Sequence, residues 1–130
     1  MIAFDSSALV KLVVQEPESA ALEAWLSDRA PVSATASDLV RVEVVRAVAR
    51  TDSTGVAVAR SLLAGVDLVP ITQDLLETAA DLGPPSLRSL DAVHLATVLS
   101  LESALEAFVV YDDRMARAAT EAGLPVVAPS

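Results

Sequence analysis

AFVVYDDRMARAATEAGLPVVA, residues 107–128, contains a strand pattern, a helix pattern and a second strand pattern in succession. Residues 107–111 form an apolar run typical of a buried strand, residues 112–123 have helical spacing that ends at Gly123, and residues 125–128 form another apolar run. No hairpin signal such as Asn-Gly separates the two strands. A crossover through a helix joins parallel strands, so this stretch predicts one strand-helix-strand unit of a parallel sheet.

The rest of the chain continues this alternation of strands and helices. Expected strands lie at 2–4, 31–34 and 67–71, and expected helices lie at 7–14, 18–28, 37–50, 54–65, 72–83 and 89–101. Ser37 and Thr72 are in position to cap the N-termini of their helices, and Gly65 is in position to end one. We therefore predict an α/β fold with three α/β/α layers and a central parallel sheet of four to five short strands.

Length and composition indicate one globular domain, residues 1–130. A chain of 130 residues is long enough for one hydrophobic core and too short for two ordinary domains, and 53% of its residues are apolar. No uncharged apolar run approaches the roughly 18 residues needed to span a membrane, and the N-terminus does not resemble a signal peptide. Because cysteine is also absent, we expect a cytoplasmic protein with no membrane partner.

The charge balance limits how the chain can bind nucleic acid. Nine basic and eighteen acidic side chains give a net charge of −9, which argues against generic binding through a basic surface. Chemistry on a phosphodiester is compatible with this charge when divalent cations bound to the carboxylates reverse it locally. Arg41, Arg46, Arg50 and Arg60 either contact a nucleic-acid backbone or are solvated helix positions paired with acids.

Acidic residues directly follow two of the predicted strands. Asp5 comes after the strand at 2–4, and Asp112 with Asp113 comes after the strand at 107–111. In open parallel sheets, ligands bind outside the carboxyl ends of the strands. Both strands are therefore expected to deliver carboxylates to the same edge of the sheet.

Two further acids interrupt apolar helical patterns, Glu43 in LVRVEVVRA and Asp91 in LRSLDAVHLATV. If these helices lean towards the same strand ends, Asp5, Glu43, Asp91 and Asp112 form a carboxylate cluster. Such charges repel and raise one another's pKa, so a cluster implies bound cations. Ligation by oxygen alone suits Mg²⁺ or Mn²⁺, whereas one histidine and no cysteine do not make an ordinary zinc site.

Four of the candidate acids also have purely structural interpretations. Asp5, and at least one of Asp112 and Asp113, are in position to cap the helix that follows. Glu43 is in position to pair with Arg46 on an exposed helix face. These interpretations compete with the metal site at each position taken singly.

Asp91 and His94 share one helix and are open to similar alternatives. Asp91 lies near the helix start, where Ser89 is in position to cap and where the helix dipole favours an anion. His94 is expected to pack or to orient a neighbouring group rather than to bind metal. A Ser-His-Asp set is not expected, and four scattered glycines contain no G-x-G-x-x-G or P-loop, so no nucleotide cofactor is expected.

Four segments carry a family resemblance that covers nearly the whole chain. They are, in chain order, IAFDSSALVKLVVQEPES (2–19), ASDLVRVEVVRA (36–47), LRSLDAVHLATV (87–98) and FVVYDDRMARAATEAGLPVV (108–127). Together they resemble the PIN-domain ribonucleases, and in particular the VapC-like toxins of bacterial type II toxin–antitoxin pairs. The first and third segments are the most specific.

The resemblance implies a Mg²⁺- or Mn²⁺-dependent endoribonuclease that hydrolyses RNA phosphodiesters and acts as the toxin of such a pair. Carried over residue by residue, it makes Asp5, Glu43, Asp91 and Asp112 the catalytic acids. Asp5, Asp91 and Asp112 are then the metal ligands, and Ser6 sits beside the site.

One position departs from the family pattern, and one leaves a choice open. The family often has Thr or Ser two residues before the fourth acid, where this chain has Val110. The missing hydroxyl is expected to alter metal occupancy or rate. Asp113 is a second candidate for the fourth acid, although the junction of strand and helix favours Asp112.

The resemblance also implies partners: an RNA substrate, a cognate antitoxin that places a basic side chain near the carboxylates, and a second copy of the chain in a homodimer. Leu22, Trp25 and Leu26 lie on one helical face and form either a wall of the antitoxin groove or part of the core. The alternative function is a catalytically weak or inactive PIN-like module that sequesters a protein or RNA partner. Cleavage of RNA distinguishes the two functions.

Overall fold

Five short strands and seven helices alternate along the chain in the computed structural model, which describes residues 1–130 except for the side chain of Glu102. The elements are β1 (Ile2–Phe4), α1 (Ser6–Lys11), α2 (Ser19–Ser27), β2 (Ala34–Ser37), α3 (Val40–Thr51), the 3₁₀ turn η1 (Ser53–Gly55), α4 (Val56–Ala64), β3 (Asp67–Val69), α5 (Gln73–Ala80), α6 (Ser89–Leu99), the 3₁₀ turn η2 (Glu102–Ala104), β4 (Ala107–Val109), α7 (Asp113–Glu121) and β5 (Val126–Val127).

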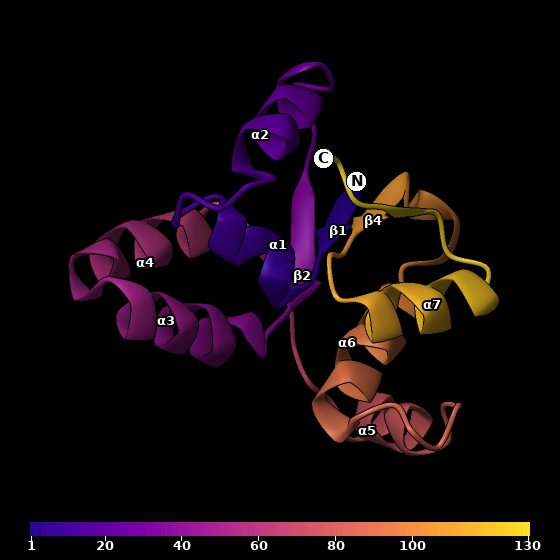
Figure 1. Cartoon of the computed structure of the whole chain (residues 1–130). Coiled ribbons are helices and arrows are strands. Elements are labelled where there is room, and N and C mark those ends of the chain that lie inside the picture. Colours follow the sequence, from indigo (N-terminus) through magenta and orange to yellow (C-terminus); the bar gives the residue numbers. More distant parts are fainter.

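The strands form one parallel sheet in the order β3-β2-β1-β4-β5 (Figure 1). The chain first builds outward from β1 through β2 to β3, and it then returns to the other side of β1 to add β4 and β5. In sheets of this kind the crevice for a ligand opens at the reversal of strand order, outside the carboxyl ends of the strands. Here that crevice lies between β1 and β4.

Helices cover both faces of the sheet (Figure 1). Side chains of α1 to α4 pack with Phe4 and Val109 on one face, whereas α6 and α7 pack with Ala3 and Phe108 on the other. A further cluster joins α5 to α6. Successive strand residues point to opposite faces, so buried strands of a sheet covered on both sides are apolar throughout. The predicted three-layer α/β/α fold with a parallel sheet is confirmed.

The prediction for the second strand and its following helix was wrong in detail. The strand occupies Ala34–Ser37 rather than 31–34, and Ser37 is its last residue rather than a helix cap. Helix α3 begins three residues later, after Leu39, which makes no side-chain capping bond. The strand consists of small and polar residues, and Thr35 gains a partner there because its Oγ1 donates to the Asp67 carbonyl at 2.9 Å. Hydrogen bonding to β1 on one side and β3 on the other therefore determines the position of this strand, which its hydropathy does not predict.

Other helix ends follow their local signals. The Thr72 hydroxyl accepts the Leu75 N–H at 3.1 Å and caps α5, and α4 ends at Gly65. After α7 the chain turns at Gly123 with φ +88°, a left-handed conformation that glycine adopts without strain. These three predictions are confirmed.

The apolar face of α2 belongs to the core. Leu22 is fully buried, and Trp25 and Leu26 pack against the same cluster. The guanidinium of Arg29 covers the Trp25 ring at 4.0 Å from its centre. The core interpretation of this face is therefore confirmed. Among the described residues, no helix has the length and apolar character needed to cross a membrane.

Candidate active site

The four predicted acids come from four different helices, and each lies at a helix N-terminus. Asp5 precedes α1 and Asp112 precedes α7 as N-cap residues, whereas Glu43 and Asp91 lie in the first turns of α3 and α6. The positive end of a helix dipole favours an anion. Helix starts thus supply the carboxylates along the edge of the sheet where β1 and β4 end.

Asp5 is held rigidly and is only 6% exposed. Its Oδ1 accepts hydrogen bonds from the Ser7 hydroxyl at 2.7 Å and from the Ala8 N–H at 3.1 Å, so Asp5 does cap α1. Its Oδ2 accepts no hydrogen bond from the described residues. The capping interpretation is confirmed, but it uses one carboxylate oxygen and leaves the other for a ligand.

The two carboxylate oxygens of Asp112 also make different contacts. Its Oδ1 accepts the Met115 N–H at 2.9 Å and caps α7, whereas its Oδ2 lies 3.5 Å from Nη2 of Arg88. The neighbouring Asp113 is exposed as the first residue of α7. Of the two acids after β4, the structure therefore directs Asp112 towards the other candidate residues.

Glu43 contacts side chains of two other helices, α1 and α6. Its Oε1 accepts a hydrogen bond from the Ser6 hydroxyl at 2.7 Å and also contacts Nε2 of His94, which is buried in α6. The expected pairing of Glu43 with Arg46 is not formed among the described side chains, so that interpretation was wrong. His94 orients a neighbouring carboxylate as expected, and the partner it selects is Glu43, from another helix.

Asp91 is paired within its own helix start. Its Oδ2 accepts a hydrogen bond from Nε of Arg88 at 3.0 Å. Ser89 does not cap the helix, because Arg88 occupies the N-cap position and makes no side-chain capping bond. Asp91 does lie in the first turn, where the dipole favours it.

The acids at this edge influence one another's charge. Burial raises the pKa of Asp5 from 3.8 to about 6, against the lowering effect of the hydrogen bonds from Ser7 and Ala8, and the nearby Asp112 carboxylate adds to the rise. For Glu43, burial acts to raise the pKa, but the hydrogen bonds from His94 and Ser6 and the positive charge of Arg88 outweigh it and lower the pKa. The groups therefore form one electrostatic unit.

The donor set suits a hard divalent cation, because carboxylate oxygens are the ligands that Mg²⁺ and Mn²⁺ prefer. In the part of the chain that the structure describes, no three His, Cys, Asp or Glu side chains are already gathered around one point. Arg88 contacts two of the four acids and His94 a third. The residues fit a divalent cation by chemistry, and among the described residues Arg88 and His94 are the basic side chains that contact these acids.

Two residues at the site were missed by sequence reasoning, Ser7 and Arg88. The Ser7 hydroxyl donates to Asp5 and accepts the Tyr111 N–H at 3.2 Å, which links the ends of β1 and β4. For Arg88, its position three residues before Asp91 was a usable signal for an ion pair. No sequence signal connects Arg88 to Asp112.

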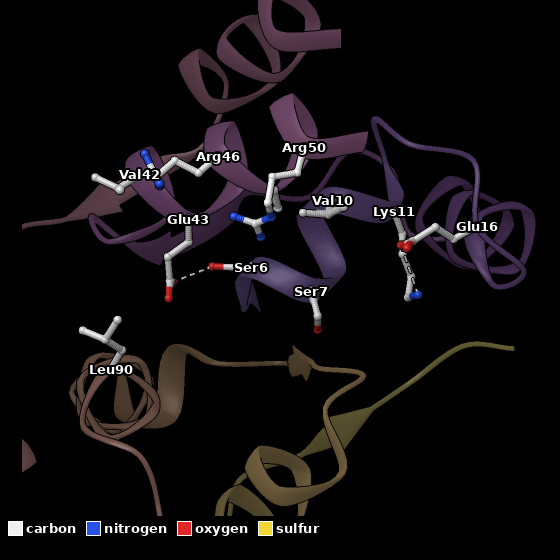
Figure 2. Close-up of a pocket in the computed structure, with 11 residues that line it drawn as sticks. Ser6, Ser7, Val10, Lys11, Glu16, Val42, Glu43, Arg46, Arg50 and Leu90 are labelled. Carbon is white, nitrogen blue, oxygen red and sulfur yellow. Dashed lines mark hydrogen bonds and ion pairs between the residues drawn. The ribbon is translucent and has the colours of Figure 1, made fainter. Parts of the chain in front are cut away.

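A cavity of about 610 Å³ lies between α1 and α3, and of the four acids Glu43 lines it. Figure 2 shows Ser6 and Glu43 joined by their hydrogen bond within it, with Arg50 directed towards them. Arg46 also lines this cavity, and neither arginine forms an ion pair with a described side chain. Lys11, in contrast, is paired with Glu16 and Glu18.

Val110 lies in the core rather than at the site. It is fully buried with Met115 and Leu95 in the cluster between the sheet, α6 and α7. A hydroxyl at this position would enter apolar surroundings. At the site itself, the hydroxyls of Ser6 and Ser7 already contact Glu43 and Asp5.

The chain is similar to curated ribonucleases along nearly its whole length. A profile of the PIN domain matches residues 2–121. Ribonuclease VapC47 of Mycobacterium tuberculosis (strain CDC 1551 / Oshkosh) is 42% identical over 132 residues, which covers 99% of this chain and 97% of the relative. Ribonuclease VapC46 of Mycobacterium tuberculosis (strain ATCC 25618 / H37Rv) is 44% identical over 129 residues, with 99% and 98% covered.

Solved structures share the fold. The crystal structure of Mycobacterium tuberculosis VapC20, described as a sarcin-ricin loop cleaving toxin, superposes with a TM-score of 0.78 at 18% identity and covers 99% of this chain and all of its own. A toxin–antitoxin complex from Klebsiella pneumoniae contains a chain with a TM-score of 0.72 at 23% identity, which covers 100% of this chain and 98% of its own. At these identities the likeness concerns the fold.

Proposed function

The chain belongs to the PIN-domain family, and from that membership we propose that it is an endoribonuclease that acts as the toxin of a toxin–antitoxin pair. The observation that carries the proposal is the convergence of acids from four helix starts on the crevice between β1 and β4. Each acid taken alone has a structural role. A shared ligand is a role that all four acids at this edge have in common.

We further propose that Asp5, Asp91 and Asp112 bind Mg²⁺ or Mn²⁺ and that Glu43 completes the catalytic set. A divalent cation at such a site lowers the pKa of an attacking water and stabilises negative charge on the phosphodiester and its leaving oxygen. Asp5 and Asp112 each offer an oxygen that is not used in capping. Their Oδ1 atoms, fixed by backbone N–H groups, keep those free oxygens in place.

Glu43 is suited to act on the water. Its pKa is lowered, so it is a carboxylate at neutral pH, and Ser6 and His94 hold its Oε1. A carboxylate fixed from two sides accepts a proton in a defined direction. In the hydrolysis, a water oxygen forms the new bond to phosphorus and Glu43 takes up the water proton. The leaving oxygen departs with the electron pair of its broken bond to phosphorus and gains a proton from solvent.

Arg46 and Arg50 are proposed to contact the RNA backbone. They are two cations without carboxylate partners among the described side chains, in a cavity that also contains Glu43. A guanidinium binds two phosphate oxygens in parallel, and no base-stacking platform is needed for such contacts. A strand held in this cavity passes directly beside Glu43.

We also propose an antitoxin partner, a homodimer and a cytoplasmic location for the protein. The acidic site binds a basic side chain of a cognate antitoxin, because opposite charges are complementary across an interface. Leu76 on α5, an exposed apolar residue outside the cavity that contains Glu43, serves as a contact with a second copy of the chain in a homodimer. With RNA as its substrate, the protein acts in the cytoplasm.

The test is cleavage of a total-RNA pool by antitoxin-free protein in Mg²⁺ or Mn²⁺, with the new ends mapped. Asp112→Asn and Asp113→Asn form a matched pair, since they make the same change at neighbouring positions and only Asp112 faces the other acids. We expect discrete cuts that EDTA abolishes. Asp112→Asn is expected to lower cleavage by roughly 100-fold or more, and Asp113→Asn to leave it near wild type.

The opposite result supports the alternative function. If the folded wild-type protein binds Mn²⁺ but cuts no RNA over a broad range of conditions, the chain is a binding module rather than a nuclease. Equal loss of cleavage in both variants would instead contradict the assignment of Asp112.

A further inference from the structure

Arg88 forms ion pairs with two acids of the site, Asp91 and Asp112. Its Nε lies 3.0 Å from Oδ2 of Asp91, and its Nη2 lies 3.5 Å from Oδ2 of Asp112. The first partner is in the same helix, whereas the second precedes α7. The guanidinium thus bridges two of the carboxylates that the proposed function assigns to the metal.

Without these two acids, the position of the Arg88 side chain would be electrostatically unfavourable. It is the N-cap residue of α6, where the helix dipole repels a cation. Its ion pairs with Asp91 and Asp112 offset this repulsion and account for its orientation. Arg88 is 65% exposed, so no packing forces the side chain over the carboxylates.

The oxygens that Arg88 contacts are those a metal needs. Oδ1 of Asp112 is already used in capping α7, which leaves Oδ2 as its free oxygen, and Arg88 faces that atom. It also donates to Oδ2 of Asp91. A guanidinium and a divalent cation at the same oxygens repel each other, so both do not bind there together.

We propose that Arg88 is a positioning residue that takes the place of the divalent cation in the metal-free protein and is displaced when the metal binds. This inference rests on the metal site of the proposed function. Arg88 neutralises Asp91 and Asp112 and keeps them together while the metal is absent. The stabilisation it provides to the metal-free state is lost on displacement, so Arg88 lowers metal affinity.

The test compares Arg88→Gln with Arg41→Gln. Arg41 pairs with Asp38 at the same three-residue spacing and is 64% exposed, but it contacts no acid of the site. Both variants therefore remove one exposed arginine and one local ion pair. Mn²⁺ affinity is measured by isothermal titration calorimetry on the full chain, and the melting temperature is measured in EDTA.

We expect Arg88→Gln to bind Mn²⁺ roughly two- to tenfold more tightly than wild type and to melt at a lower temperature in EDTA. Arg41→Gln is expected to keep the wild-type Mn²⁺ affinity. Binding by Arg88→Gln alone, with none detected for wild type, also supports the proposal. A merely structural ion pair would lower the melting temperature without changing metal affinity.

Unchanged or weaker Mn²⁺ binding by Arg88→Gln overturns the role of Arg88 and leaves the proposed nuclease intact. If neither protein binds Mn²⁺, the metal site fails and the role of Arg88 fails with it. RNA cleavage, assayed separately, then shows whether the nuclease proposal survives without the metal.

Discussion

Asp5 serves folding as a helix cap, and we propose that it also serves the chemistry of the site. It caps α1 through Oδ1, and its burial raises its pKa to about 6 because an ionised carboxylate is disfavoured away from water. A cap alone does not need burial, since capping residues are commonly exposed. Capping therefore does not by itself explain why this carboxylate is buried, and the ligand that we propose for Asp5 does.

The raised pKa of Asp5 predicts a pH dependence of stability in metal-free protein. Between its ordinary value of 3.8 and the folded value of about 6, the folded state binds more protons than the unfolded state, so stability falls as pH rises through this range. From pH 5 to pH 7.5 we expect wild type to lose about 1 kcal/mol relative to Asp5→Asn, by urea unfolding in EDTA.

Asp113→Asn is the control for this prediction, because it removes an exposed carboxylate of the same type. It is expected to keep the wild-type pH dependence. The lowered pKa of Glu43 acts in the opposite direction, but only below its ordinary value of 4.5, outside the measured range. Parallel pH profiles for wild type and Asp5→Asn would show that burial of Asp5 does not govern stability.

At the scale of elements, α3 combines two functions along one helix. Its first turn carries Glu43, and one and two turns later it carries Arg46 and Arg50 at the same cavity. Residues three and four apart share a helix face, so the spacing alone places the three side chains together. The helix itself therefore aligns Glu43 with the two arginines that we propose bind phosphate.

We predict that Arg46→Gln with Arg50→Gln weakens RNA binding and reduces its salt dependence. The slope of log affinity against log salt should fall by roughly 0.7 for each phosphate group that the variant no longer binds. Anisotropy of a labelled RNA, measured with Asp112→Asn protein to prevent cleavage, gives both values. The control is Arg114→Gln with Arg117→Gln, which removes the same charge from α7, away from the cavity.

Equal effects of the two double variants would mean that only net charge matters. The cavity beside Glu43 would then not be an RNA-binding surface.

At the scale of the whole molecule, a large apolar side chain left exposed by the fold predicts an interface. Leu76 on α5 is 48% exposed and lies outside the cavity that we assign to RNA. We expect Leu76→Lys to weaken the proposed homodimer about tenfold or more, measured by sedimentation velocity, because an interface core disfavours charge. Val58→Lys on α4, where Val58 is 57% exposed, is expected to dimerise like wild type.

A wild-type protein that sediments as a monomer at all concentrations would contradict the dimer. So would equal weakening by both substitutions.

The sequence predicted most of the fold because most of its signals are local. Apolar runs predicted β1 and β4, and Thr72 and Gly123 predicted helix ends, all from neighbouring residues. The second strand was misplaced because its residues are small and polar, and only pairing with the strands on both sides makes it a strand. Hydrogen bonding between neighbouring strands leaves no periodic pattern in the amino-acid sequence.

The candidate acids were likewise indicated by local position, after a strand or within an apolar helix. The side chains that contact these acids were not indicated by local position. His94 reaches Glu43 across 51 residues, and Arg88 reaches Asp112 in another helix. Covalent order sets which side chains precede each helix, and packing of the layers sets which of those side chains meet. The acids thus follow from the sequence, whereas the contacts that His94 makes with Glu43 and Arg88 with Asp112 follow only from tertiary packing.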